Sequence, residues 1–332
     1  MLTDSYLRKH DYLRVSITDH CNLRCAYCMP PEGVALLSHD QVLRNEEFIR
    51  LIGIFVSLGV VKVRFTGGEP LLRKGFVDIA AKTREMFPAL ELCLTTNGTL
   101  LGDFIGDLKD HGVRKLNISL DTLSRDRYRS ITRRDCFEDV IRNIDRALAE
   151  SYFDVKINAV LSGDTIAELD DFLEYFKERN VTLRFIERMP FTAEPHGGSF
   201  LPSDRFIEEL AARGDLDRNR AIDTSVALMY NFMYRGRYPV RIGVIPPVSK
   251  KFCGSCNRLR LTSDGSLKTC LHSGADHALK ELLRSGADDA AVAREILAAV
   301  KQKHEGHSLD CASDEGGCAA LVSTGFMSKI GG

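Results

Sequence analysis

The sequence predicts an α/β fold in which six βα units form a parallel sheet and a smaller, cysteine-bearing domain follows. Two observations predict it. Short apolar, β-branched runs alternate with amphipathic helical patterns up to about residue 190. Beyond that point the alternation stops and a stretch rich in proline and glycine, 190–202, begins. Six βα units in succession imply a parallel sheet, either curled into a barrel or doubly wound.

The predicted strands are short and apolar enough to be buried on both faces, as parallel strands are. They cover residues 13–18, 61–65, 90–95, 115–120, 154–160 and 182–187. Apolar residues at helical spacing separate them; Phe137, Val140, Ile144 and Leu148, for example, predict a helix before the fifth strand. Because the chemistry of such sheets sits at the carboxyl ends of the strands, we expect functional side chains there.

The C-terminal part has a different pattern. After the loop-rich stretch we expect a short helix and a strand near 240–245. A hairpin of 258–262 and 266–270 follows, turned at Asp264-Gly265. Two helical patterns, 276–284 and 288–303, come next.

Composition limits the classes of partner. The 332 residues include 45 Lys and Arg against 46 Asp and Glu, a net charge of −1. This balance argues against nucleic acid or a membrane surface as a partner. The N-terminus has no apolar signal segment, and the longest strongly apolar run, 51–61, falls short of the about 20 residues of a membrane span. We therefore expect a cytoplasmic protein whose ten cysteines are reduced and serve metal binding or catalysis.

Three of these cysteines, Cys21, Cys25 and Cys28, lie in the loop after the first predicted strand. Their C-x3-C-x2-C spacing suits three corners of a 4Fe–4S cluster, with one iron left open because no fourth cysteine is near. Structural zinc prefers four protein ligands. The alternatives are a zinc knuckle completed by His20 and a chance cluster.

A second set, Cys253, Cys256 and Cys270, surrounds the predicted hairpin. Its C-x2-C knuckle with a distant third cysteine is also a zinc-ribbon layout, so zinc stays open here. Because the chain also carries the first set, we favour a second 4Fe–4S cluster with an open iron over zinc.

Positive charge gathers around this second set. Residues 238–272 carry six basic residues against one acid, Asp264, so the segment is +5 and the rest of the chain −6. Arg258 and Arg260 alternate on a predicted strand and therefore point to the same side, where two guanidinium groups suit a triphosphate. The alternative is a solvated strand face. Lys156, inside a predicted parallel strand, is costly to bury without an anion.

These motifs resemble a known family. The first cysteine spacing, with Tyr27 before the third cysteine, is similar to the signature of the radical S-adenosylmethionine (SAM) enzymes. Residues 12–19, leading into that motif, resemble the GTP 3′,8-cyclases of molybdenum cofactor biosynthesis. The resemblance implies an incomplete (β/α)6 TIM-like barrel over 1–235 and a C-terminal domain over 236–332 that carries the second iron–sulfur cluster.

The resemblance also implies site residues. SAM would be bound by Tyr27, Gly68 and Glu69 (the latter two in the Thr66–Leu71 segment TGGEPL), Ser119 and Met189. GTP would be bound by Arg14, Arg64, Thr95, Lys156, Arg258, Leu259 and Arg260. The catalytic residues would be Arg14, Arg258, Arg260 and the C-terminal Gly331 and Gly332, whose tail would thread into the active site.

The implied reaction is a radical cyclisation with two 4Fe–4S clusters and SAM as cofactors. A 5′-deoxyadenosyl radical would take the 3′ hydrogen of GTP, and the C3′ radical would attack guanine C8. The resulting aminyl radical would then be reduced, giving (8S)-3′,8-cyclo-7,8-dihydroguanosine 5′-triphosphate. An electron-donor protein and the next enzyme of molybdopterin synthesis would be partners, and the chain would be a monomer or homodimer. The rival hypotheses are a peptide-modifying radical SAM enzyme and a non-catalytic zinc-ribbon protein.

Four cysteines remain. Cys93 and Cys136 lie on apolar faces of a strand and a helix, and we expect them in the core. Cys311 and Cys318, with His304 and His307, occupy a stretch that departs from the family pattern. We interpret it as an insert with reduced thiols rather than a small zinc site.

Overall fold

The computed structural model describes residues 1–332 apart from 190–199, 218–221, 224–225, 273–275, 308–326 and 331–332. The predicted α/β fold is confirmed. All six predicted parallel strands are present in chain order, and each agrees with its prediction to within two residues at either end. They are β1 (Tyr12–Ser16), β2 (Lys62–Thr66), β3 (Glu91–Thr96), β4 (Val113–Ser119), β5 (Asp154–Leu161) and β6 (Val181–Glu187).

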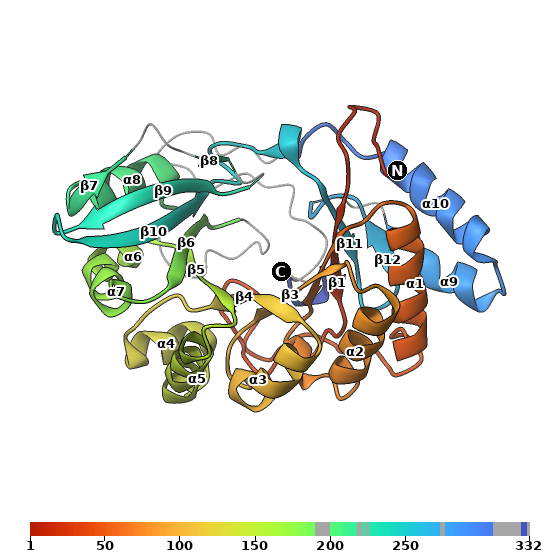
Figure 1. Cartoon of the computed structure of the whole chain (residues 1–332), viewed down its shortest axis with the longest axis horizontal. Coiled ribbons are helices and arrows are strands. Elements are labelled where there is room, and N and C mark those ends of the chain that lie inside the picture. Colours follow the sequence, from red (N-terminus) through yellow and green to blue (C-terminus); the bar gives the residue numbers. More distant parts are fainter. Residues whose placement is uncertain (190–199, 218–221, 224–225, 273–275, 308–326, 331–332) are drawn as a thin grey trace.

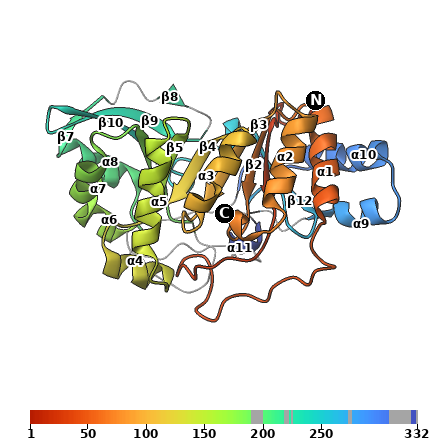
Figure 2. The same ribbon diagram turned by 60° about the horizontal axis from the view of Figure 1, so that its bottom comes forward.

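Helices connect these strands and cover one side of the sheet. Figure 1 shows the strands in an open arc, with α1, α2, α3, α5 and α7 on its outer side. In the turned view of Figure 2, α2, α3 and α5 lie in front of the strands. Their bounds are α1 (Asn45–Ser57), α2 (Phe76–Met86), α3 (Leu101–Asp110), α4 (Arg125–Thr132), α5 (Phe137–Ala149), α6 (Gly163–Ala167) and α7 (Leu169–Phe176), with a short helix η1 (Pro70–Leu72) after β2.

The C-terminal part extends this sheet at both edges. At one edge β10 (Tyr238–Ile245) pairs parallel to β6, and β9 (Leu228–Tyr234) pairs antiparallel to β10. At the other edge β11 (Arg258–Leu261) pairs parallel to β1, and β12 (Ser266–Lys268) completes the predicted hairpin. The described strands therefore form one continuous sheet, to which both the N-terminal and the C-terminal parts contribute.

Shorter elements complete the C-terminal part. The described ones are α8 (Ser203–Ala211), β7 (Gly214–Leu216), β8 (Ile222–Asp223), η3 (Cys253–Ser255), β13 (His277–Ala278), α9 (Leu279–Arg284), α10 (Asp289–Lys301) and α11 (Met327–Ile330). In Figure 1, α11 lies inside the arc of strands. No described helix has the length and apolar character needed to cross a membrane.

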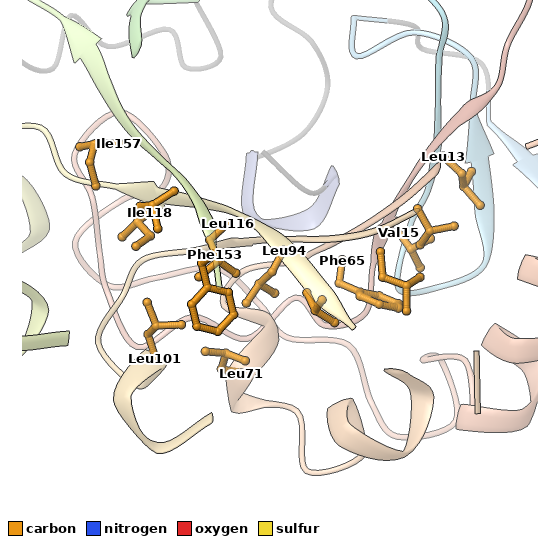
Figure 3. Packing of buried hydrophobic residues seen from close by; sticks show 14 of the residues in the cluster. Leu13, Val15, Phe65, Leu71, Leu94, Leu101, Leu116, Ile118, Phe153 and Ile157 are labelled. Atoms are coloured by element: carbon orange, nitrogen blue, oxygen red, sulfur yellow. The ribbon is translucent and has the colours of Figure 1, made fainter. Parts of the chain in front are cut away.

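The hydrophobic core lies between the outer face of the sheet and the helices. Figure 3 shows part of it: Leu94, Leu116 and Phe153 lie on the side of Leu101 of α3, and Phe65, Val15 and Leu13 follow along the sheet away from it. The inner face differs from our expectation of strands that are apolar on both faces. In β5, buried apolar residues alternate with Lys156 and Asn158, which face a cavity. Because successive side chains on a strand point to opposite faces, the outer face builds the core and the inner face builds the site.

Candidate active site

A cavity of about 430 Å³ lies on the inner face of the sheet. All six cysteines of the two predicted sets line it, although the sets are more than two hundred residues apart in the sequence. The pairing of β11 with β1 explains this convergence, because it places the segment that carries Cys253 and Cys256 beside the strand that leads into Cys21.

The first cysteine set lies on a loop held by backbone hydrogen bonds. Arg24 and Ala26 donate to the carbonyls of Thr132 and Ile131, both at 2.9 Å, so the end of α4 supports the loop. Burial raises the pKa of Cys21 to about 11, so this thiol needs a bound cation to become a thiolate. Three such thiols facing one cavity form a donor set that fits an iron–sulfur cluster.

The paired glycines allow two loops to meet. A Cβ atom on Gly67 would lie 2.5 Å from the Thr18 carbonyl oxygen, and one on Gly68 would lie 2.2 Å from that of His20. The backbone N–H groups of Gly68 and Glu69 donate to the carbonyls of Thr18 and His20 at 2.8 and 2.7 Å. Glycine is therefore required here for close approach, and it fixes the cysteine loop against the end of β2.

Glu69 lies behind this loop and is absent from the cavity wall. Its fully buried carboxylate accepts hydrogen bonds from the N–H of Leu71 (3.1 Å), the hydroxyl of Thr96 (2.8 Å) and the N–H of Asn97 (2.6 Å). Burial raises its pKa to about 7, although these hydrogen bonds act in the opposite direction. Of the two residues, Gly68 reaches the cavity, and Glu69 orders the backbone around it.

Tyr27, Ser119 and Met189 also line the cavity, as expected for residues that contact one ligand. The Tyr27 hydroxyl donates to Oδ2 of Asp121 at 2.7 Å, and Oδ1 of Asp121 accepts from the N–H of Val160 at 2.8 Å. Asp121 thereby orients the aromatic side chain next to Cys28. A polar residue directly after a buried strand was the available sequence signal for Asp121.

Among the described residues, eight cationic side chains line the cavity against two carboxylates, those of Asp121 and Glu187. Arg14 and Arg260 are direct neighbours in the β1–β11 pair, and Arg258 is the neighbour of Tyr12. Burial is the largest influence on Arg260 and lowers its pKa well below the usual value, and the nearby charges of Arg14 and Arg258 lower it further. Such a concentration of positive charge favours a polyanionic ligand. The eight are Arg14, Lys62, Arg64, Lys156, Arg184, Arg188, Arg258 and Arg260.

Arg64 is held from two sides. Its Nε donates to the Tyr12 hydroxyl at 2.7 Å, and its Nη1 donates to the Leu94 carbonyl at 2.6 Å. Burial raises the pKa of Tyr12, but the charges of Arg64, Arg14 and Arg258 outweigh it and lower the pKa to about 7. The phenol therefore acts as a weak internal counter-charge within the cationic wall.

The structure corrects our reasoning on Lys156. We inferred from burial alone that this lysine needs an anionic ligand, but its Nζ already forms an ion pair of 2.8 Å with Asp154. The two residues are two positions apart on β5 and so share a face. Lys156 still lines the cavity, but its burial alone no longer indicates a ligand.

Several predicted residues lie elsewhere. The side chain of Leu259 is fully buried in the core, so only its backbone is available to a ligand. Gly331 and Gly332, like Cys311 and Cys318, lie outside the described residues, although Met327 of α11 lines the cavity. Cys93 is buried in the core as expected. Cys136, at the start of α5, is partly buried and packs against the core.

Sequence reasoning missed Asn158 and Arg184 as lining residues, and it named Asn117 only as one of several polar residues at the end of a predicted strand. Oδ1 of Asn117, Oδ1 of Asn158 and Nε of Arg184 are buried at the cavity and lack a hydrogen-bond partner among the described residues. Thr95, which was predicted, shares this property at Oγ1. Asn158 and Arg184 alternate with apolar residues on central strands, and this was the signal that a polar inner face existed.

The second cysteine set lies near the amino end of β11, whereas Cys21 follows the carboxyl end of the neighbouring β1. Cys253 is in η3, and Cys256 and Cys270 flank the β11–β12 hairpin. Hydrogen bonds from His307 lower the pKa of Cys253. His307 thus belongs to this set's surroundings, whereas His304 is exposed, so the hypothetical zinc site of the 304–318 stretch gains no support from the described residues.

Comparison with known proteins identifies the family. Residues 15–176 match the Radical SAM superfamily model and residues 181–309 match the Molybdenum Cofactor Synthesis C model. A GTP 3′,8-cyclase from Clostridium botulinum (strain Okra / Type B1) is 42% identical over 276 residues, covering 82% of this chain and 84% of the relative. The GTP 3′,8-cyclase of Alkaliphilus oremlandii is 38% identical over the full length of both chains. The chain belongs to the GTP 3′,8-cyclase family.

A third relative and a solved structure agree with this assignment. The GTP 3′,8-cyclase of Heliobacterium modesticaldum is 41% identical and covers 93% of this chain and 95% of its own length. The crystal structure of Streptococcus suis SuiB bound to S-adenosylmethionine has a TM-score of 0.63 at 14% identity, over 85% of this chain and 67% of SuiB. That similarity shows the fold, a radical SAM partial barrel. Family membership makes the chain a radical SAM enzyme and decides against a non-catalytic zinc-ribbon protein.

Proposed function

We propose that this chain converts GTP to 3′,8-cyclo-7,8-dihydroguanosine triphosphate in molybdenum cofactor synthesis, and that both reactants bind in the one cavity described above. The observation that carries the proposal is the convergence of two cysteine sets and a cationic wall on a single cavity. A peptide-modifying enzyme has no need of this wall, because a peptide carries no triphosphate.

We assign the first end of the cavity to SAM. Cys21, Cys25 and Cys28 would hold a 4Fe–4S cluster, which when bound supplies the electron that cleaves SAM and yields a 5′-deoxyadenosyl radical. Gly68 offers backbone polar groups close to this loop, and Tyr27, Ser119 and Met189 offer side chains. The orphaned polar atoms of Asn117 and Asn158 fit a ligand with several hydroxyl or amino groups.

We assign the cationic wall to the triphosphate of GTP. Arg14, Arg258 and Arg260 lie on two paired strands, and Arg64 is fixed by Tyr12 and Leu94, so the wall is organised before the ligand arrives. A preorganised wall of arginines loses little conformational entropy on binding and matches phosphate oxygens in pairs. Thr95 and Lys156 add a hydroxyl and an ammonium group on the strands between the two ends.

We assign Cys253, Cys256 and Cys270 to a second 4Fe–4S cluster, which would keep one iron without a cysteine ligand and so available to a heteroatom of GTP. The chain's own contribution is to hold the C3′ hydrogen near the SAM end, to hold the base at the other end and to exclude water. Positioning of this kind is worth up to about 7–11 kcal/mol of a barrier. We also propose that Gly331 and Gly332 reach the cavity, since Met327 and the buried Ile330 precede them.

We further propose a cytoplasmic location, an electron-donor protein as partner and transfer of the product to the next enzyme of the pathway. We propose 1–235 and 236–332 as the units of the chain. Strands of the second unit pair with β1 and β6 of the first and so extend its sheet at both edges. The chain would act as a monomer or homodimer.

Anaerobic incubation with GTP, SAM and a strong reductant tests the reaction. We expect 5′-deoxyadenosine to form in step with loss of GTP. When ATP replaces GTP, we expect neither formation of 5′-deoxyadenosine nor loss of the nucleotide. If 5′-deoxyadenosine forms at the same rate without GTP and no cyclised product accumulates, the proposal is wrong. Iron and acid-labile sulfide analysis of the same preparation tests the cofactors, because the proposal requires both.

A further inference from the structure

Lys303, in the segment that follows α10, contacts a cysteine of the second set. Lys303 is only 4% exposed. Its Nζ donates to the Arg258 carbonyl at 2.8 Å and lies 3.7 Å from Sγ of Cys256. A side chain that could extend into solvent is instead directed at a sulfur atom.

The position of Lys303 is fixed by the N-terminal segment. Arg8 donates to the carbonyls of Cys253 (2.7 Å), His304 (2.6 Å) and Glu305 (2.6 Å), and so ties the segment after α10 to the cysteine turn. Arg8 is itself held by Asp4 at 2.6 Å. Because three carbonyls converge on one guanidinium group, the backbone that follows Lys303 is held against the cysteine turn.

The buried ammonium group lacks a carboxylate partner. Within the described part of the chain, no Asp or Glu forms an ion pair with Lys303. Asp4 is the carboxylate that acts on it, but Asp4 is already engaged by Arg8 and His10, at 2.6 and 3.0 Å. Burial of an unpaired ammonium group is expensive, so a further negative charge is expected nearby.

The thiolates of the second cysteine set would supply that charge. Nζ of Lys303 lies 3.7 Å from Sγ of Cys256, so a thiolate at that position would place negative charge directly beside the ammonium group. Neutral thiols offer no such compensation. Three thiolates held by a metal cluster would, and the lysine would in turn offset part of their charge.

We propose that Lys303 is a positioning residue for the metal cluster of Cys253, Cys256 and Cys270, where its ammonium group offsets thiolate charge and donates to the sulfur of Cys256. The inference rests on the proposed function, which assigns a cluster to these cysteines. A cation beside a ligating sulfur stabilises the more negative, reduced state of the cluster, so it raises the reduction potential.

The test uses the full-length chain in which Cys21, Cys25 and Cys28 are replaced by Ala, so that only the second set can bind a cluster. This parent is compared after anaerobic reconstitution with Lys303→Met and Lys303→Arg. The control is Lys301→Met, two residues earlier on the exposed end of α10. Two properties are measured: the midpoint potential, by redox titration followed by electron paramagnetic resonance, and the rate of iron loss to a chelator.

We expect Lys303→Met to have a lower midpoint potential than the parent and to lose iron about tenfold faster. Lys303→Arg and Lys301→Met should match the parent in potential. Equal potentials and equal iron loss in Lys303→Met and Lys301→Met would overturn the inference. A parent that binds no iron or sulfide at all would instead overturn the proposed function, so the two failures are distinguishable.

A second measurement guards against a variant that merely folds poorly. In the cluster-free chain the buried ammonium group destabilises the folded state, because no thiolate charge compensates it. Lys303→Met should therefore unfold at the same or a higher temperature than the parent. In the reconstituted chain the same change should lower the unfolding temperature. A decrease of equal size in both states would mean that Lys303 only packs, and would contradict the inference.

Discussion

The hydroxyl oxygen of Tyr12 accepts a hydrogen bond of 2.7 Å from Nε of Arg64, in the middle of the cationic wall. Both residues are buried, and the two strands that carry them are neighbours in register. The phenol therefore fixes one guanidinium group and partly neutralises the charge around it.

Replacing Tyr12 with Phe should weaken GTP binding. The change leaves Nε of Arg64 buried without its acceptor, a loss of about 1–3 kcal/mol. We expect KM for GTP to rise about tenfold or more, with a smaller change in kcat, measured as GTP-dependent formation of 5′-deoxyadenosine. An unchanged KM would show that Arg64 does not depend on the phenol.

The ionisation of Tyr12 should make an absorbance signal of the GTP-free protein depend on pH. Its pKa is lowered from 10 to about 7, because the charges of Arg64, Arg14 and Arg258 outweigh burial, which acts to raise it. A lowered acid pKa stabilises the folded state above that pKa, so stability from this group grows between pH 7 and 10 and is lost as pH falls through 7. The difference in absorbance at 295 nm between the parent and Tyr12→Phe should titrate near pH 7. GTP should shift this titration upward, because its phosphates compete for the same arginines.

Gly68→Ala should abolish SAM binding. A Cβ atom at this position would lie 2.2 Å from the carbonyl oxygen of His20, so the cysteine loop would have to move away from the end of β2. Gly106→Ala in α3 is a matched control, since no atom lies within 4 Å of the added carbon, and it should stabilise the helix by up to about 1 kcal/mol. Equilibrium dialysis with labelled SAM measures the effect, and equal affinity in both variants would refute the role given to the glycine pair.

Arg260→Gln should weaken GTP binding without lowering the thermal stability of the ligand-free chain. Arg260 is buried beside Arg14 and Arg258, so removal of its charge relieves repulsion in the ligand-free chain. We expect an equal or higher unfolding temperature without GTP. Binding of GTP should weaken by about 2–5 kcal/mol, because a buried cation that meets the triphosphate is lost. Arg241→Gln, at an exposed position within β10, is the control, and an equal loss of affinity there would argue against a localised triphosphate site.

Much of this arrangement could be predicted from the sequence. Each of the six strands is a short apolar run between helical patterns. The local order of apolar residues is therefore sufficient to locate these strands. The cysteine sets were also predictable, because the spacing of Cys21, Cys25 and Cys28 restricts what they can bind. The alternation of Arg258 and Arg260 on one strand correctly placed both in the cavity.

Other features depend on contacts between residues distant in sequence. The pairing of β11 with β1 joins segments about 246 residues apart, and no local pattern reveals it. The hydrogen bonds that Thr96 and Asn97 donate to the Glu69 carboxylate are likewise tertiary contacts that no local pattern reveals. Lys156 is a different case, since its partner Asp154 is two residues away and a strand places both on one face.

The central claim is that SAM and GTP react within one cavity. The most direct measurement uses GTP carrying deuterium at C3′, incubated anaerobically with SAM, reductant and the reconstituted enzyme, followed by mass spectrometry of the 5′-deoxyadenosine. The account predicts that one deuterium is transferred to the 5′ carbon of 5′-deoxyadenosine as GTP is consumed. Unlabelled 5′-deoxyadenosine, formed at a rate independent of GTP, would contradict it.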